Sequence, residues 1–212
     1  MKYFLNLILV SFILSSVASA SEKNSQLWNK PSKLNNIKYN KILKKIAITK
    51  PVTKGFIQNK KLGALNRTLK SSGVMYIAKK GVCWKTLNPV SNSLLLTDNG
   101  IVQKSADGKK NIKSADDDMR TGYIVKIMLA MFLAKKEMLE DEFKVFFDGS
   151  DENWQIGLIP ERRVMRKVVK NIIISGAGQV TNITILKTGG DFVSIDISDS
   201  SLQGISLDNC VQ

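Results

Sequence analysis

The side chains that could do chemistry in this 212-residue chain are mainly carboxylates and two cysteines, because the chain contains no histidine. The absence of histidine excludes Ser-His-Asp and Cys-His nucleophiles, histidine zinc sites and histidine general bases. Carboxylates cluster at 137–142 and 148–152, where a pair could act as general acid and base. Their placement on one predicted helix and one turn is typical of solvated faces. We therefore predict no enzyme, no catalytic residue and no cofactor.

Three consecutive aspartates, Asp116, Asp117 and Asp118, are the best metal candidate in the sequence. Carboxylate oxygens suit hard cations. The aspartates also directly precede a predicted helix, where negative side chains cap the first turn and complement the helix dipole. The capping interpretation is simpler, and no metal site is predicted.

The two cysteines, Cys83 and Cys210, allow two interpretations. In an oxidising compartment they could form one disulfide that joins the C-terminal tail to the middle of the fold. Otherwise they are two separate thiols. The sequence gives no distance between them, so both alternatives stay open.

The N-terminus has the pattern of a secretory signal peptide. Lys2 precedes a mostly apolar run, and small residues ending in Ala18-x-Ala20 follow it. We predict cleavage after Ala20 and a periplasmic, soluble mature protein. The alternative is an uncleaved anchor, but the apolar run is shorter than the roughly 20 residues that span a bilayer. No cysteine follows that could carry a lipid.

The rest of the chain divides into a polar arm at 21–38, a domain at 39–200 and a tail at 201–212. Apolar residues at helical spacing predict a short helix near 39–48. Period-two patterns and turn residues then predict an antiparallel meander that a helix interrupts at about 119–140. The fold class is mostly β with α, an open barrel of about ten strands. The strands are expected at 52–63, 67–79, 81–87, 92–98, 100–105, 143–147, 154–158, 168–175, 180–187 and 191–198.

The inserted helix is apolar without a break from Ile127 to Ala134, so it needs apolar contact on every side. A strongly curved sheet of this width can leave a hollow for a ligand, and the helix could close it. The alternative is an ordinary core in which the helix covers one face of the sheet.

Four stretches carry a resemblance to a known family. They read Phe56-x-Gln58-x-Lys60-x-Leu62-x-x-Leu65, Leu69-x-Ser71-Ser72-Gly73, Gly81-Val82-x-Trp84-x-Thr86-x-x-Pro89, and Ser93 through Thr97 to Gly100. This segment resembles the LolA-like outer-membrane lipoprotein carriers. The similarity extends more loosely through the helix and Trp154-x-Ile156-x-Leu158-x-Pro160 to about residue 198.

The resemblance implies an incomplete barrel with a helical lid over a cavity for acyl chains. By position in the pattern, the expected cavity residues are Phe56, Tyr76, Trp84, Phe147, Trp154 and Ile156, and the expected lid residues are Met128, Met131 and Phe132. Simple core packing is the alternative for each aromatic residue. A register slip of one residue would place the whole set on the other face.

One departure from the family concerns the lid. The best-known carriers have an Arg-Pro pair on the strand before the tryptophan-containing strand, and its arginine helps to hold the lid shut. Here the stretch reads Ala78-Lys79-Lys80-Gly81. Lysine lacks the planar fork of arginine, so the latch and the cargo are both in question. The departure suggests the divergent branch associated with lipid or pigment export.

The chain has a formal net charge of +14 and no carboxylate between Glu22 and Asp98. Such a basic half is suited to anionic phospholipid or to an acidic partner surface. The predicted docking residues are Lys41, Lys44, Lys45, Lys60, Lys61, Lys79 and Lys80. The alternative is that the excess only reflects a composition rich in Lys, Asn and Ile.

Together these patterns favour a monomeric periplasmic carrier that moves a lipoprotein or other lipidic cargo from an inner-membrane exporter to an outer-membrane acceptor. A lipid- or lipoprotein-sensing module with the same fold is the alternative. The charge also suggests nucleic acid, but export and the lack of interleaved aromatic and basic residues argue against it.

Overall fold

The computed structural model describes residues 26–32, 36–63, 67–115 and 119–212. The predicted signal peptide and the three aspartates lie outside the described residues. The strands of the first half are β1 (Val52–Leu62), β2 (Arg67–Ala78), β3 (Gly81–Asn88), β4 (Asn92–Thr97), β5 (Gly100–Lys104) and β6 (Lys110–Ser114). Those of the second half are β7 (Phe143–Ser150), β8 (Asn153–Pro160), β9 (Val169–Ala177), β10 (Gln179–Lys187) and β11 (Phe192–Asp199).

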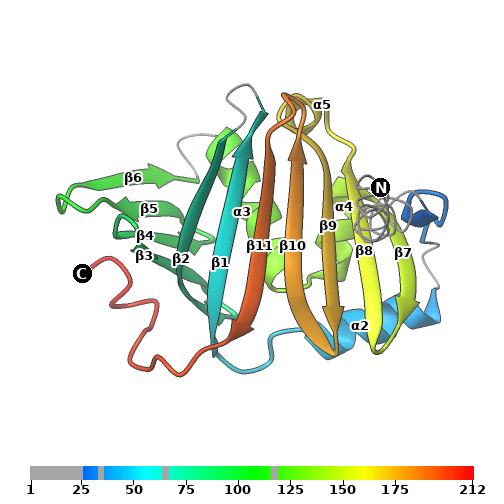
Figure 1. Cartoon of the computed structure of the whole chain (residues 1–212), viewed down its shortest axis with the longest axis horizontal. Helices are drawn as coiled ribbons and strands as arrows, with labels where there is room; N and C mark the ends of the chain where they lie inside the picture. The colour runs from blue at the N-terminus through cyan, green and yellow to red at the C-terminus, as the bar shows by residue number, and fades with distance from the viewer. Residues whose placement is uncertain (1–25, 33–35, 64–66, 116–118) are drawn as a thin grey trace, which may run out of the picture.

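All eleven strands form one open antiparallel sheet in the order β6-β5-β4-β3-β2-β1-β11-β10-β9-β8-β7. The order follows from two meanders, β1 to β6 and β7 to β11, that meet where β1 pairs with β11 (Figure 1). The predicted mostly-β open sheet is confirmed. The sheet has one strand more than expected, because β6 is almost wholly exposed and so shows no buried face in its sequence pattern.

Three helices lie on one face of the sheet, which we call the inner face (Figure 1). They are α2 (Ile37–Ile46), α3 (Met119–Phe132) and α4 (Lys136–Glu142). A short helix, α5 (Arg163–Arg166), follows β8. Asn36 caps α2, since its Oδ1 accepts a hydrogen bond from the backbone N–H of Tyr39 at 3.1 Å. The predicted single helix at 119–140 is two helices, broken at Ala134, whose φ of 49° is left-handed.

Alternation along the strands sends apolar side chains to the inner face. Val193, Ile195 and Ile197 of β11 belong to or pack against the one large core, together with residues of α2, α3 and α4. The opposite, outer face carries a smaller cluster of Leu27, Phe146 and Ile173. Because Leu27 is fully buried, residues 26–32 are not a free arm but pack on β7 to β9.

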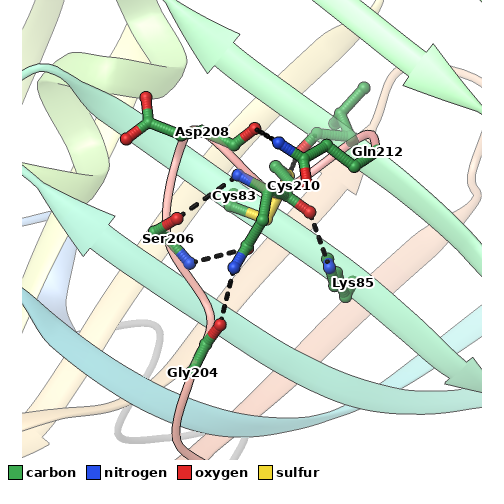
Figure 2. Close-up of a disulfide and its surroundings, with 9 residues drawn as sticks. Cys83, Lys85, Gly204, Ser206, Asp208, Cys210 and Gln212 are labelled. Carbon is green, nitrogen blue, oxygen red and sulfur yellow. Dashed lines mark hydrogen bonds between the residues drawn. A yellow bond between two sulfur atoms is a disulfide. The ribbon is translucent and has the colours of Figure 1, made fainter.

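The C-terminal tail crosses the outer face of β3 and β4 (Figure 2). Cys83 and Cys210 form a disulfide with a Cα–Cα distance of 5.6 Å. Lys85 Nζ also donates a hydrogen bond to the Asn209 carbonyl oxygen at 3.0 Å. Of the two states that the sequence left open for the cysteines, the structure therefore contains the bridge, which closes a loop across 127 positions.

Candidate functional site

A cavity of about 830 Å³ lies between α3 and the inner face of the sheet. Its walls come from β1 to β5, β10, β11, the β3–β4 turn and α3. Most of its lining residues are apolar. These are Leu69, Trp84, Pro89, Val90, Leu94, Met128, Met131, Phe132, Ile183, Ile185, Val193 and Ile195.

The remaining lining residues are polar or basic. They are Gln58, Lys60, Thr68, Lys70, Ser71, Thr86, Asn92 and Gln103. Among the lining residues that the structure describes, none is a carboxylate. The described lining therefore gives the cavity an apolar interior with a positive charge at its margin.

All three predicted lid residues line this cavity. Met128, Met131 and Phe132 are partly buried, whereas Val125, Leu129 and Ala130 of the same helix are almost fully buried in the core. This division explains why α3 is apolar all round. One side of the helix packs in the core, and the other side faces the cavity. Methionine adapts well to an irregular apolar surface.

Aromatic rings form the wall at the centre of the sheet. Trp84 lies with its ring centroid 4.1 Å from that of Phe56 and 6.1 Å from that of Phe132. Trp84 faces the cavity, and Phe56, which is 3% exposed, backs it. The ring of Phe132 thereby joins the helix to the sheet.

A second cavity of about 330 Å³ lies on the other side of the end of α3. Met131, Phe132 and Ile183 line both cavities and so separate them. The remaining lining residues lie mainly on the α2–β1 connection and at the adjoining ends of β1, β2, β10 and β11. They are residues 45–51, Val52, Lys54, Ile77, Gln179, Val180 and Ile197.

The other predicted cavity residues lie elsewhere. Phe147, Trp154 and Ile156 point to the inner face but are buried in the closed core near α2, where the Phe147 ring lies 5.9 Å from that of Tyr39. Tyr76 lies on the outer face, because it pairs with Cys83, and contributes to a pocket beside Ser206 of the tail. The structure thus brings Trp84 and the lid together and keeps these four residues apart from them.

Sequence reasoning missed the floor of the cavity, which Ile183, Ile185, Val193 and Ile195 form. The alternation of β11 gave the signal, since it placed Val193 and Ile195 on one buried face. What the sequence lacked was the pairing of β11 with β1, which brings this face opposite α3.

A buried carboxylate, Glu142, connects α3 and α4 with the segment that follows β8. Glu142 at the end of α4 is 1% exposed, and its Oε1 lies 3.1 Å from Lys126 Nζ of α3. Arg162 contributes Nε at 2.7 Å from Glu142 Oε2 and Nη2 at 3.2 Å from Oε1. Such charge-assisted, two-point contacts are the stronger class of hydrogen bond. They tie α3 and α4 to the segment after β8.

The predicted docking lysines lie at two opposite ends of the strands. Lys60 and Lys61 lie near the β1–β2 connection, at the margin of the large cavity, whereas Lys79 and Lys80 form the β2–β3 turn at the other end. Lys44 and Lys45 lie in the last turn of α2, and Lys41 pairs with Asp151 at 2.6 Å. The hydrogen bond from Lys41 lowers the pKa of Asp151.

Within the described ranges, no group of three or more His, Cys, Asp or Glu side chains could hold a metal ion. In the same part of the chain, no helix combines the length and hydropathy that a membrane span requires.

No family model and no curated protein sequence matches the chain. Its fold is similar to that of several solved structures. A LolA superfamily protein from Nitrosomonas europaea has 8% identity over 80% of this chain and 96% of its own, with a TM-score of 0.45. A DUF1329 family protein from Desulfovibrio piger has 10% identity over 82% and 96%, with a TM-score of 0.43.

The third structure is a domain from Vibrio parahaemolyticus named as an outer membrane lipoprotein-sorting protein. It has 8% identity over 82% of this chain and 96% of its own, with a TM-score of 0.43. The likeness concerns the course of the chain, so the ligand must be argued from the cavity.

The contacts of Glu142 predict unequal roles for two neighbouring arginines. Arg162→Ala should lower the free energy of unfolding by about 1–3 kcal/mol, because a buried carboxylate loses a two-point partner. Arg163→Ala, a change to an exposed side chain, should stay within about 0.5 kcal/mol of wild type. Urea unfolding of both variants measures the difference, and equal losses would contradict this role of Glu142.

Proposed function

We propose that the protein is a periplasmic carrier that holds the acyl chains of a lipoprotein or other lipidic cargo in the 830 Å³ cavity beneath α3 and carries it between the two membranes. The observation that carries the proposal is the lining of this cavity. Apolar groups predominate there, the described lining contains no carboxylate, and methionines with flexible side chains line it on the α3 side.

The size of the cavity suits such a cargo. Its volume is within the roughly 300–1,000 Å³ of sites that bury most of a small organic ligand. Burial of a methylene group is worth about 0.8 kcal/mol, so about a dozen methylenes contribute on the order of 10 kcal/mol. Apolar contact alone can therefore retain a chain, and binding requires no reactive group.

Two further features support an exported carrier. The N-terminal pattern of Lys2, an apolar run and Ala18-x-Ala20 is that of a secretory leader. The disulfide between Cys83 and Cys210 is of a kind that persists in oxidising compartments such as the periplasm. In this proposal the mature chain begins at Ser21, and residues 39–200 are the carrier domain.

The basic margin of the cavity sets which end of the carrier faces an anionic membrane. Lys60 of β1 and Lys70 of β2 line the cavity, and Lys61 follows Lys60 in the chain. Each lysine near an anionic membrane surface contributes about 1 kcal/mol to the free energy of membrane binding. A carrier that docks with this end would present the cavity to the bilayer from which the cargo leaves or into which it enters.

A charge on the cavity side of α3 tests the proposal. Met131→Asp should reduce the affinity for acyl chains at least tenfold, because an ionised group would face the bound chain. The matched control is Met138→Asp on α4, since Met138 is also partly buried against the core but lines neither cavity. Native mass spectrometry of both periplasmically expressed variants measures the bound acyl material, and thermal melting measures their stability.

Wild type and Met138→Asp should retain acyl material, and Met131→Asp should lose it without a larger fall in melting temperature than the control shows. Retention in Met131→Asp, or a wild-type protein that is repeatedly recovered empty, would contradict the proposal.

The docking direction predicts a difference between two lysine pairs. Charge reversal of Lys60 and Lys61 to Glu should weaken binding to vesicles that contain phosphatidylglycerol more than the same change at Lys79 and Lys80. Wild-type binding should also fall steeply between low and physiological salt. Vesicle co-sedimentation measures both effects. Equal losses in the two double variants, or binding that does not depend on salt, would contradict docking by the cavity end.

A further inference from the structure

Strand β2 is paired with β1 along almost its whole length, but with β3 along only part of it. It pairs with β1 from Arg67 to Ile77, but its pairing with β3 begins at Ser72, beside an irregularity in the register. In Figure 1, β3 lies beside only the lower part of β2. Within the described part of the chain, no further backbone hydrogen bond reaches the segment Arg67–Ser71. We call this segment the open edge.

The open edge forms one margin of the large cavity. Thr68, Leu69, Lys70 and Ser71 all line it, and Pro89 and Val90 of the β3–β4 turn line it as well. Residues 67–70 are exposed, and Leu69 keeps 53% and Val90 keeps 60% of its surface exposed. Free backbone groups and exposed apolar side chains therefore lie together where a bound acyl chain would emerge.

The charge around the open edge favours one class of occupant. Arg67 and Lys70 lie on it, and Lys60 lies on the adjacent β1. None of these three residues has an ion pair or side-chain hydrogen bond within the described residues. By contrast, Lys54, further along β1, pairs with Asp199 at 2.6 Å. These positive charges at the margin of the cavity can thus bind polar or acidic groups attached to the acyl chain of a cargo.

An exposed strand edge offers a row of unpaired N–H and C=O groups, and natural proteins usually cover, twist or shorten such edges. Proteins that leave an edge open often use it to add a strand from an extended peptide, whose backbone supplies the hydrogen bonds. An edge that borders an acyl cavity is suited to a molecule that has both an acyl chain and a peptide.

We propose that the open edge binds the first residues of a lipoprotein cargo as an added β-strand while the acyl chains of that cargo occupy the cavity. This inference rests on the proposed function and narrows its ligand from any lipidic molecule to an acylated polypeptide. The cavity then contributes affinity through apolar burial, and the edge contributes selection for a peptide with little dependence on its side chains.

The test compares three synthetic ligands. The first is a short Ser-, Asn- and Asp-containing peptide with a palmitoyl group on its N-terminus. The second is the same lipopeptide with N-methyl groups on alternate backbone nitrogens, in two versions that together cover both alternations. The third is palmitate alone. Removal of two backbone hydrogen bonds should weaken one of the N-methylated versions about tenfold relative to the first ligand.

Hydrogen–deuterium exchange locates the bound peptide. The lipopeptide should slow exchange of amides in Arg67–Ser71, and palmitate should not. The matched control within the chain is β6, an exposed strand at one end of the sheet that β3, β4 and β5 separate from β2. Its exchange should not change with either ligand.

Each other outcome has a distinct meaning. Equal affinity for the lipopeptide and both N-methylated versions would overturn the inference, as would protection of β6 equal to that of Arg67–Ser71. If palmitate still binds in that case, the proposed function stays intact. Failure of all ligands to bind would count against the proposed function itself. Concentration-dependent dimers that protect Arg67–Ser71 without ligand would assign the edge to a second copy of the chain and also overturn the inference.

Discussion

The structure depends on a mismatch between one wide sheet and the three short helices that cover it. The inner face of the sheet runs across eleven strands, but α2 and α4 close it near β7 to β10, where Trp154 and Ile156 are fully buried. The helix α3 packs against β3 to β6, and the cavity separates it from β1, β2, β10 and β11. Because close packing needs side chains from both sides, the region beneath this single helix keeps unfilled volume. The cavity is the direct consequence.

The helix that covers the cavity must satisfy two surroundings at once. Val125, Leu129 and Ala130 pack like core residues, whereas Met131 and Phe132 face open volume. A helix of this kind gains less from packing than one buried on all sides, so polar contacts at its margin matter more. Glu142 provides them by joining Lys126 of α3 to Arg162 after β8. A buried carboxylate thus ties down the cover in a chain that has no Arg-Pro pair before the Trp84 strand.

Sequence periodicity was sufficient for most of the fold, because the strands have one buried and one wetted face. Alternation and turn residues located ten strands, whereas β6 has no buried face and gave no signal. The family resemblance assigned Met128, Met131 and Phe132 to the lid, and all three line the cavity. The residues of the cavity walls were harder to predict from the sequence. Tyr76 and Trp84 were both assigned to the cavity, yet the pairing of Tyr76 with Cys83 places its side chain on the outer face. Phe147 and Trp154 point inward, but only the position of α2 determines that they lie in closed core.

The central claim is that apolar volume beneath α3 binds an acyl chain. The most direct measurement is the affinity for saturated fatty acids of increasing length, determined by titration calorimetry at one pH and salt concentration. A cavity that takes up the chain predicts that the binding free energy grows by roughly 0.8 kcal/mol per added methylene until the volume is filled, after which affinity levels off. An affinity that does not change with chain length, or no binding at any length, would contradict the account.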